Sequence, residues 1–123
     1  MAHERIRYLL PSLLKGLTFS PLVGILGQRQ TGKTTLMRSV VKNRSVSLDD
    51  QELLEAALLN PKSFVAREDL PFGIDECQLA PPLFSALKLR VQNNPRPGQF
   101  ILTGSVRFTS RKAIRESVFW SGT

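Results

Sequence analysis

The sequence of 123 residues contains one cysteine, one histidine and one tryptophan, and it has no long apolar stretch. Because Cys77 is alone, an internal disulfide is excluded, and a reducing compartment is compatible with the chain. No apolar run reaches the length of a membrane span, and the N-terminus lacks an apolar signal-peptide core followed by small residues. We therefore expect a cytoplasmic protein without a membrane span.

Acidic residues are also few: 10 Asp and Glu stand against 17 Lys and Arg, which gives a net charge of +7. This excess is compatible with a polyanionic partner such as nucleic acid, although a nucleotide-binding protein also needs positive charge. A hydrophobic share of 41% is typical of a globular chain rather than a disordered one. The length allows one modest core and excludes a second full domain.

One segment fits the pattern G-x-x-x-x-G-K-[ST] of a phosphate-binding loop, the Walker A motif. Its glycines let the backbone turn tightly and expose successive N–H groups to phosphate oxygens, while the lysine adds charge and the hydroxyl reaches a magnesium ion. The motif requires a strand before it and a helix after it, and the apolar run 21–26 and the amphipathic segment 34–42 meet this requirement. The predicted binding residues are Gly27, Gln28, Arg29, Gln30, Thr31, Gly32, Lys33, Thr34 and Thr35.

The segment 70–78 is the second one that indicates a chemical function. It is predicted to be an apolar strand that ends in Asp75 and Glu76, which is typical of a Walker B motif. A carboxylate at the carboxyl end of a strand near the loop can hold the hydration shell of Mg²⁺ beside Thr34. Asp75 suits that role, and Glu76 can act as a general base on the water that attacks the γ-phosphate. Pro71 and Gly73 interrupt the apolar run, so the strand is weak on its own.

The remaining elements follow from periodicity and from turn residues. We expect a helix over 3–16 that Pro11 breaks or kinks, and an edge strand over 44–50. Helices are predicted over 51–59, with Asp49 or Asp50 as the cap, and over 62–69 and 83–91. A third apolar strand over 99–105 can present Thr103 or Ser105 to the γ-phosphate.

The last segment, 106–123, carries four basic residues: Arg107, Arg111, Lys112 and Arg115. A charge run of this kind is most often a solvated helix face. Two alternatives stay open, namely an arginine finger for a neighbouring subunit and a contact with nucleic acid. Phe119 and Trp120 near the terminus either cap the core or leave an exposed patch.

Three motifs thus stand in order, at 27–36, 74–78 and 100–105, and together they resemble the AAA-type P-loop ATPases of prokaryotes that usually carry a C-terminal DUF4143 domain. Residues 47–50 and 115–117 look like further signposts of that family. The resemblance implies an α/β fold of the additional-strand type, a parallel sheet sandwiched by helices with the strand 100–105 between the other two. It also implies ATP and Mg²⁺, with Lys33 and Thr34 on phosphate and metal, Asp75 on the metal, Glu76 as the catalytic base and Ser105 as a catalytic sensor.

After Ser117 the chain departs from the family pattern and looks truncated or frameshifted. We therefore expect the last strand beside the loop strand to be missing, which would leave a hydrophobic edge open to pairing. The expected organisation is an N-terminal helical segment at 1–20, a P-loop ATPase core at 21–117 and a divergent tail at 118–123.

The leading prediction for function is an ATP-binding P-loop domain that hydrolyses ATP with Mg²⁺ when it is complete or assembled. The expected partners are the nucleotide and either a second copy of the chain or the missing C-terminal domain. A GTPase is excluded because no Asn/Thr-Lys-x-Asp segment follows a later strand. The alternatives are a truncated, non-catalytic nucleotide-binding remnant and a basic nucleic-acid-binding module.

Overall fold

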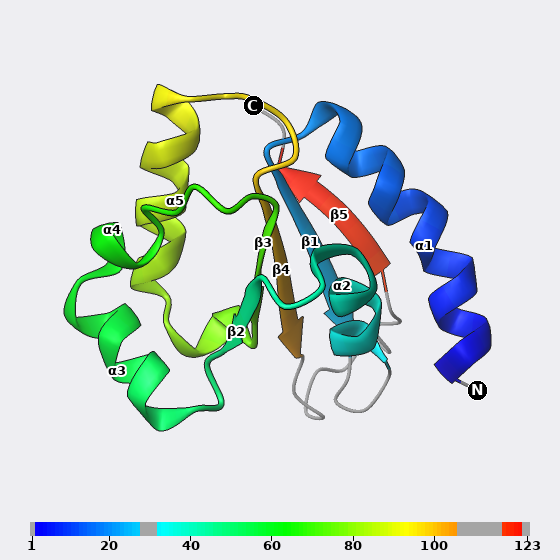
Figure 1. Ribbon diagram of the computed structural model, residues 1–123, viewed down its shortest axis with the longest axis horizontal. Coiled ribbons are helices and arrows are strands. Elements are labelled where there is room, and N and C mark those ends of the chain that lie inside the picture. Colours follow the sequence, from blue (N-terminus) through cyan, green and yellow to red (C-terminus); the bar gives the residue numbers. More distant parts are fainter. Residues whose placement is uncertain (1, 28–31, 106–116, 122–123) are drawn as a thin grey trace, which may run out of the picture.

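The computed structural model describes residues 2–27, 32–105 and 117–121 (Figure 1). The predicted phosphate contacts of Gln28, Arg29, Gln30 and Thr31 and the basic residues Arg107, Arg111, Lys112 and Arg115 lie outside this described part. The described elements are, in chain order, α1 (Ala2–Phe19), β1 (Leu22–Gly27), α2 (Lys33–Val41), β2 (Ser45–Ser47), α3 (Gln51–Leu59), α4 (Pro61–Phe64), β3 (Phe72–Asp75), the 3₁₀ turn η1 (Cys77–Leu79), α5 (Pro82–Asn93), β4 (Phe100–Ser105) and β5 (Ser117–Ser121).

The strands form one sheet in the order β2-β3-β4-β1-β5. The first four strands of this order run parallel, with β4 paired to β1 on one side and to β3 on the other. Parallel strands joined by helices, with helices on the faces, define an α/β fold. The predicted α/β fold is therefore confirmed, including the position of the strand 100–105 between the loop strand and the Asp-Glu strand.

The fifth strand corrects one prediction, that of an open edge beside the loop strand. β5 pairs antiparallel with β1, and the register sets Leu22 opposite Ser121 and Leu26 opposite Ser117. The residues of β5 include valine, phenylalanine and tryptophan, which favour extended structure, and an unpaired strand edge offers them a full row of hydrogen-bonding groups. The edge of β1 is therefore covered. The strand that covers it lies largely in the segment 118–123, which was expected to be a divergent tail.

Two hydrophobic clusters flank the sheet. On one face, α1 and α2 pack against β1 and β4 through residues such as Leu13, Leu36 and Met37. On the other face, α3, α4 and α5 pack against β3 and β4, and these three helices lie together on the side of β2 in Figure 1. The sheet is thus sandwiched between helices, as the resemblance implied.

Local signals in the sequence account for most of the helix boundaries. Asp50 caps α3, because its side chain accepts hydrogen bonds from the N–H groups of Glu52 and Leu53. α4 consists of a single turn, Pro61–Phe64, and is therefore shorter than the predicted helix over 62–69. Pro11 does not break α1, which continues from Ala2 to Phe19 as one element, so the predicted break is wrong. Packing of the apolar face around Leu13 holds the helix together across the proline.

Gly73 shows why the Asp-Glu strand departs from a continuous apolar run. A Cβ atom at this position would lie 2.6 Å from Sδ of Met37 and 3.0 Å from its Cγ. The bare backbone of β3 therefore lets α2 approach closely, and the first residues of α2 are Lys33 and Thr34. A residue that looks like a defect in the strand thus makes room for the Met37 side chain between α2 and β3.

Replacing Gly73 with Ala is expected to lower the free energy of unfolding by roughly 1–3 kcal/mol, because the added methyl group overpacks the contact with Met37. Urea denaturation followed by circular dichroism measures the change. A double-mutant cycle with Met37→Ala is the control: the two substitutions should be strongly non-additive, because Met37→Ala removes the atoms that the methyl group meets. Additive effects would show that this contact does not set the packing of α2 on β3.

Candidate nucleotide-binding site

The carboxyl ends of the four parallel strands meet at one edge of the sheet. The register pairs Gly27, the last residue of β1, with Ser105, the last residue of β4. On the other side it pairs Ser47, the last residue of β2, with Asp75, the last residue of β3. Ligands of open parallel sheets bind at this edge, since the loops that leave the strands converge there.

The loop helix begins at the same edge. Gly32 precedes α2 with φ 89° and ψ 6°, a left-handed conformation that glycine adopts without steric cost. The carbonyl oxygen of Gly32 accepts the first helical hydrogen bond, from the N–H of Leu36 at 2.8 Å. The N–H groups at the start of α2 and the positive end of its dipole therefore face the edge where Gly27 ends β1, an arrangement suited to anions. Thr35 lies in this first turn and is exposed.

The carboxylate of Asp75 accepts hydrogen bonds from hydroxyl groups of three different elements. Oδ1 accepts hydrogen bonds from the hydroxyl of Thr34 at 2.8 Å and from that of Thr103. Oδ2 accepts a hydrogen bond from the hydroxyl of Ser47 at 3.1 Å. The carboxylate is buried, and these donors fix its orientation. Its Oδ1 and the Thr34 hydroxyl form a pair of hard oxygen donors that fits a small divalent cation such as Mg²⁺.

Glu76 sits in a strained position and is surrounded by donors. Its φ of 57° and ψ of 46° are left-handed, which costs a residue with a side chain about 1–3 kcal/mol and is typical of functional sites. Its Oε2 accepts a hydrogen bond from the hydroxyl of Ser105 at 3.0 Å and lies 3.9 Å from Nζ of Lys33. Its Oε1 accepts a hydrogen bond from the side-chain amide of Gln78 at 2.8 Å.

Lys33 completes the cluster, because its Nζ donates a hydrogen bond to the Ser105 hydroxyl at 2.9 Å. Lys33 and Glu76 are only 4% and 5% exposed, so the ion pair is shielded from water. Five of the predicted site residues therefore lie together at one edge of the sheet: Lys33, Thr34, Asp75, Glu76 and Ser105.

One predicted role, that of Thr103, differs from the observed contacts, and two residues were missed. Thr103 is buried against Asp75 and also accepts a hydrogen bond from the N–H of Glu76 at 3.0 Å, so it does not point to a phosphate beside Ser105. Thr103 and Ser105 are two residues apart and so lie on the same face of β4, but only Ser105 ends the strand, and Thr103 lies one step back along it, beside Asp75. Ser47 and Gln78 received no role from the sequence, although both lie inside segments that resemble the family.

Cys77 directly follows Asp75 and Glu76 in the sequence. The thiol is buried, and burial raises its pKa to about 12. It therefore stays neutral near pH 7, where a thiolate would be needed for nucleophilic attack or metal binding. Its side chain packs in the cluster between the sheet and α5, as a small hydrophobic residue would.

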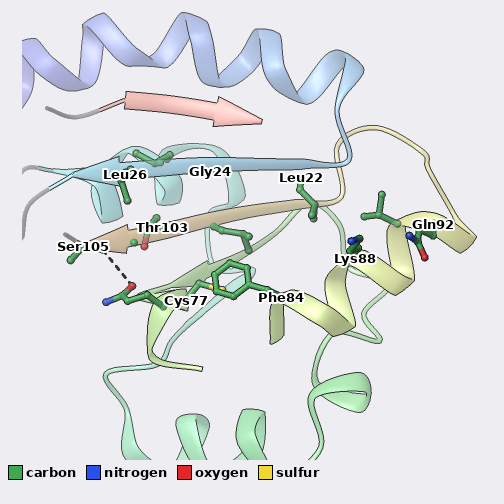
Figure 2. A pocket seen from close by; sticks show the side chains of 14 residues that line it. Leu22, Gly24, Leu26, Cys77, Phe84, Lys88, Gln92, Thr103 and Ser105 are labelled. Carbon is green, nitrogen blue, oxygen red and sulfur yellow. Dashed lines mark hydrogen bonds between the residues drawn. The ribbon is translucent and has the colours of Figure 1, made fainter. Parts of the chain in front are cut away.

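A groove of about 530 Å³ lies on the sheet face next to α5. Figure 2 shows its floor of strand residues, including Leu22, Gly24 and Leu26 of β1, and its wall of Phe84 and Lys88. The groove meets the candidate site at Thr103, Ser105 and Gln78, and the hydrogen bond between Ser105 and Gln78 is the dashed line in that view. Lys33, Thr34 and Asp75 are not among its lining residues, so the groove is distinct from the phosphate end of the site.

Among the described residues, no helix combines the length and the apolar character that crossing a membrane requires.

Comparisons with known proteins agree with this geometry. Residues 20–119 match the sequence profile of a family described as AAA domain. Two curated proteins are each 34% identical to the chain over 95 residues: the uncharacterized protein Mb2031c of Mycobacterium bovis and the uncharacterized protein Rv2008c of Mycobacterium tuberculosis. The aligned part is 76% of this chain and 22% of each relative, so the chain spans about a fifth of their length. No solved structure matches the chain.

Proposed function

The chain belongs to the AAA domain family, and we propose that it binds ATP with Mg²⁺ and hydrolyses it. Membership of this family suggests nucleotide binding and an ATPase-like function. The observation that carries the proposal is the cluster of Lys33, Thr34, Asp75, Glu76 and Ser105 at the edge where the parallel strands end. Phosphate binding is assigned to the loop 27–34 and to Thr35 behind it. In this proposal the loop N–H groups surround the phosphates, and Lys33 pairs with their β- and γ-oxygens.

Thr34 and Asp75 would hold Mg²⁺, since they offer the two oxygen donors described above. When bound there, Mg²⁺ would neutralise charge that develops on the β- and γ-phosphate oxygens. Ser47 and Thr103 keep the Asp75 carboxylate in place by hydrogen bonds from both sides. These two hydroxyl residues are therefore positioning residues of the proposed site.

Glu76 acts as the general base in this proposal. Oε2 takes a proton from a water molecule as the water oxygen bonds to the γ-phosphorus, and the bond from that phosphorus to the bridging oxygen breaks. The products are ADP and inorganic phosphate. Gln78 donates a hydrogen bond to Oε1, and the Ser105 hydroxyl, which donates to Oε2, lies beside the proton-accepting oxygen, where it would contact the γ-phosphate.

An arginine supplied to the γ-phosphate would raise the rate of such a site by about 10³–10⁵. The basic residues of 107–115 or an arginine of a neighbouring subunit are the predicted sources. The C-terminal DUF4143 domain, the truncation and the cytoplasmic location also stay predictions, because the family match concerns the AAA domain alone.

Replacing Lys33 with Ala is expected to weaken ATP binding roughly 10- to 100-fold, which is the worth of a charge-assisted hydrogen bond to phosphate. A fluorescent ATP analogue titrated in the presence of Mg²⁺ measures the affinity. Lys62→Ala is the matched control, since Lys62 is an exposed lysine of α4, a helix that contributes no residue to the cluster. This variant should bind ATP as the parent does. Equal affinity for Lys33→Ala and the parent would remove the loop as the binding site.

The net charge of +7 favours one other function, that of a basic nucleic-acid-binding module. Such a module would bind DNA with an affinity that falls steeply with salt, because neutralised phosphates release counterions. Retention on DNA that is sensitive to salt and indifferent to ATP would support this alternative over the ATPase.

A further inference from the structure

The side chain of Lys33 is already engaged by the protein itself. Its ammonium group donates to Ser105 at 2.9 Å and lies 3.9 Å from Oε2 of Glu76, and Ser105 donates to that same oxygen at 3.0 Å. The three groups form a closed triangle in which each is in contact with the other two. Because Lys33 is only 4% exposed, water contributes little to balancing its charge, and the carboxylate does so instead.

A carboxylate oxygen and a phosphate oxygen are similar partners for an ammonium group, since both are anionic acceptors of short, charge-assisted hydrogen bonds. The proposed function requires Lys33 to contact phosphate. To do so, its ammonium group has to leave Ser105 and Glu76. The same movement removes the cation that covers Oε2, the oxygen that has to accept a proton from water.

We propose that Glu76 and Ser105 compete with phosphate for the ammonium group of Lys33, so that nucleotide binding and the uncovering of Glu76 are one exchange. This inference rests on the proposed function of the site. The ammonium group of Lys33 stays paired with an anion before and after the exchange, which avoids an unpaired buried charge. Gln78 stays on Oε1 throughout and keeps the carboxylate at the site. The base is therefore blocked until phosphate reaches the loop.

The exchange makes an unusual prediction for binding: removing a partner of Lys33 should tighten the nucleotide complex. ADP is the probe, because it carries the β-phosphate and cannot be hydrolysed at the γ-position, and isothermal titration calorimetry measures its dissociation constant. Ser105→Ala should bind ADP about threefold to tenfold more tightly than the parent, which is the worth of one hydrogen bond. Glu76→Gln should bind it at least tenfold more tightly, since it also removes the competing charge.

Two matched variants separate contact from general electrostatics. Ser105→Ala leaves the net charge unchanged, so tighter binding cannot come from reduced repulsion of the phosphates. Ser85→Ala removes a hydroxyl from an exposed position of α5, outside the site, and should bind ADP as the parent does. Circular dichroism of each variant establishes that it is folded. Glu76→Gln tests the same exchange independently, because it changes the other partner of Lys33.

The outcomes distinguish this inference from the proposed function. Tighter ADP binding by Ser105→Ala and Glu76→Gln, with parent-like Ser85→Ala, supports the exchange. Unchanged or weaker binding by both variants, while Lys33→Ala has lost affinity, overturns the exchange and leaves the binding site in place. ADP binding that does not depend on Lys33 overturns the exchange together with the proposed function.

Discussion

Replacing Glu76 with Gln is expected to slow phosphate release from ATP about a thousandfold while ATP remains bound. A positioned general base contributes roughly 10²–10⁴ to a rate, and a side-chain amide cannot take the proton of the attacking water. Glutamine has the length and shape of glutamate, and its single amide oxygen can still accept one of the two hydrogen bonds that Ser105 and Gln78 donate to Glu76. The loss should therefore appear in turnover and not in binding.

A malachite-green assay for phosphate, run at saturating ATP with Mg²⁺, measures this effect. Glu52→Gln is the matched control, because Glu52 is an exposed glutamate in the first turn of α3, and it should release phosphate as the parent does. Turnover by Glu76→Gln at the parent rate would remove Glu76 as the base. A different carboxylate would then have to act as the general base, and Asp75 would be the first candidate.

Replacing Arg90 with Ala is expected to lower the free energy of unfolding by roughly 3–4 kcal/mol, a large share of the stability of a small domain. Arg90 joins three segments of the chain through one guanidinium group. It donates to the carbonyl oxygens of Val65 at 2.7 Å and Arg67 at 2.8 Å, and to the side-chain oxygen of Gln99 at 3.0 Å. The same group lies 5.2 Å from the centre of the Phe100 ring. Alanine would leave these acceptors without their donor.

Urea denaturation of the parent and of three variants tests this role. Lys88→Ala is the control on the same helix, since Lys88 is exposed, and it should change the free energy of unfolding by less than about 0.5 kcal/mol. Arg90→Lys should fall between the parent and Arg90→Ala, because an ammonium group cannot reproduce the fork of guanidinium donors. A loss of less than about 1 kcal/mol in Arg90→Ala would show that water satisfies the three acceptors.

Much of the site could be predicted because its residues carry local signals. The spacing of Gly27, Gly32 and Lys33 allows few backbone conformations, and the structure shows β1 before the loop, α2 after it and a left-handed Gly32. Asp75 and Glu76 follow an apolar run, and the carboxyl ends of parallel strands share one edge of a sheet. Strand order could be predicted only from the resemblance, since hydrogen-bonded neighbours lie far apart in the chain.

The errors have a common cause, which is that tertiary contacts outweighed local tendencies. Pro11 was expected to break or kink its helix, but it does not break it, because the apolar face of α1 packs on the sheet on both sides of the proline. Gly73 looked like a flaw in a strand, but its missing side chain makes room for Met37. The terminal segment looked like an unpaired tail, but the free edge of β1 pairs with it.

The sequence by itself determined the chemistry of the protein: a glycine loop, a lysine and hydroxyl behind it, two adjacent carboxylates and a serine at a strand end. Those residue types and spacings are covalent facts that no fold can alter. Only the tertiary structure decided which of them touch. Lys33, Glu76 and Ser105 meet because β4 lies between β1 and β3, and this places the lysine at the start of α2 against the Glu76 carboxylate. Contacts between residues so far apart in the chain depend on sheet order and close packing, which the local sequence does not encode.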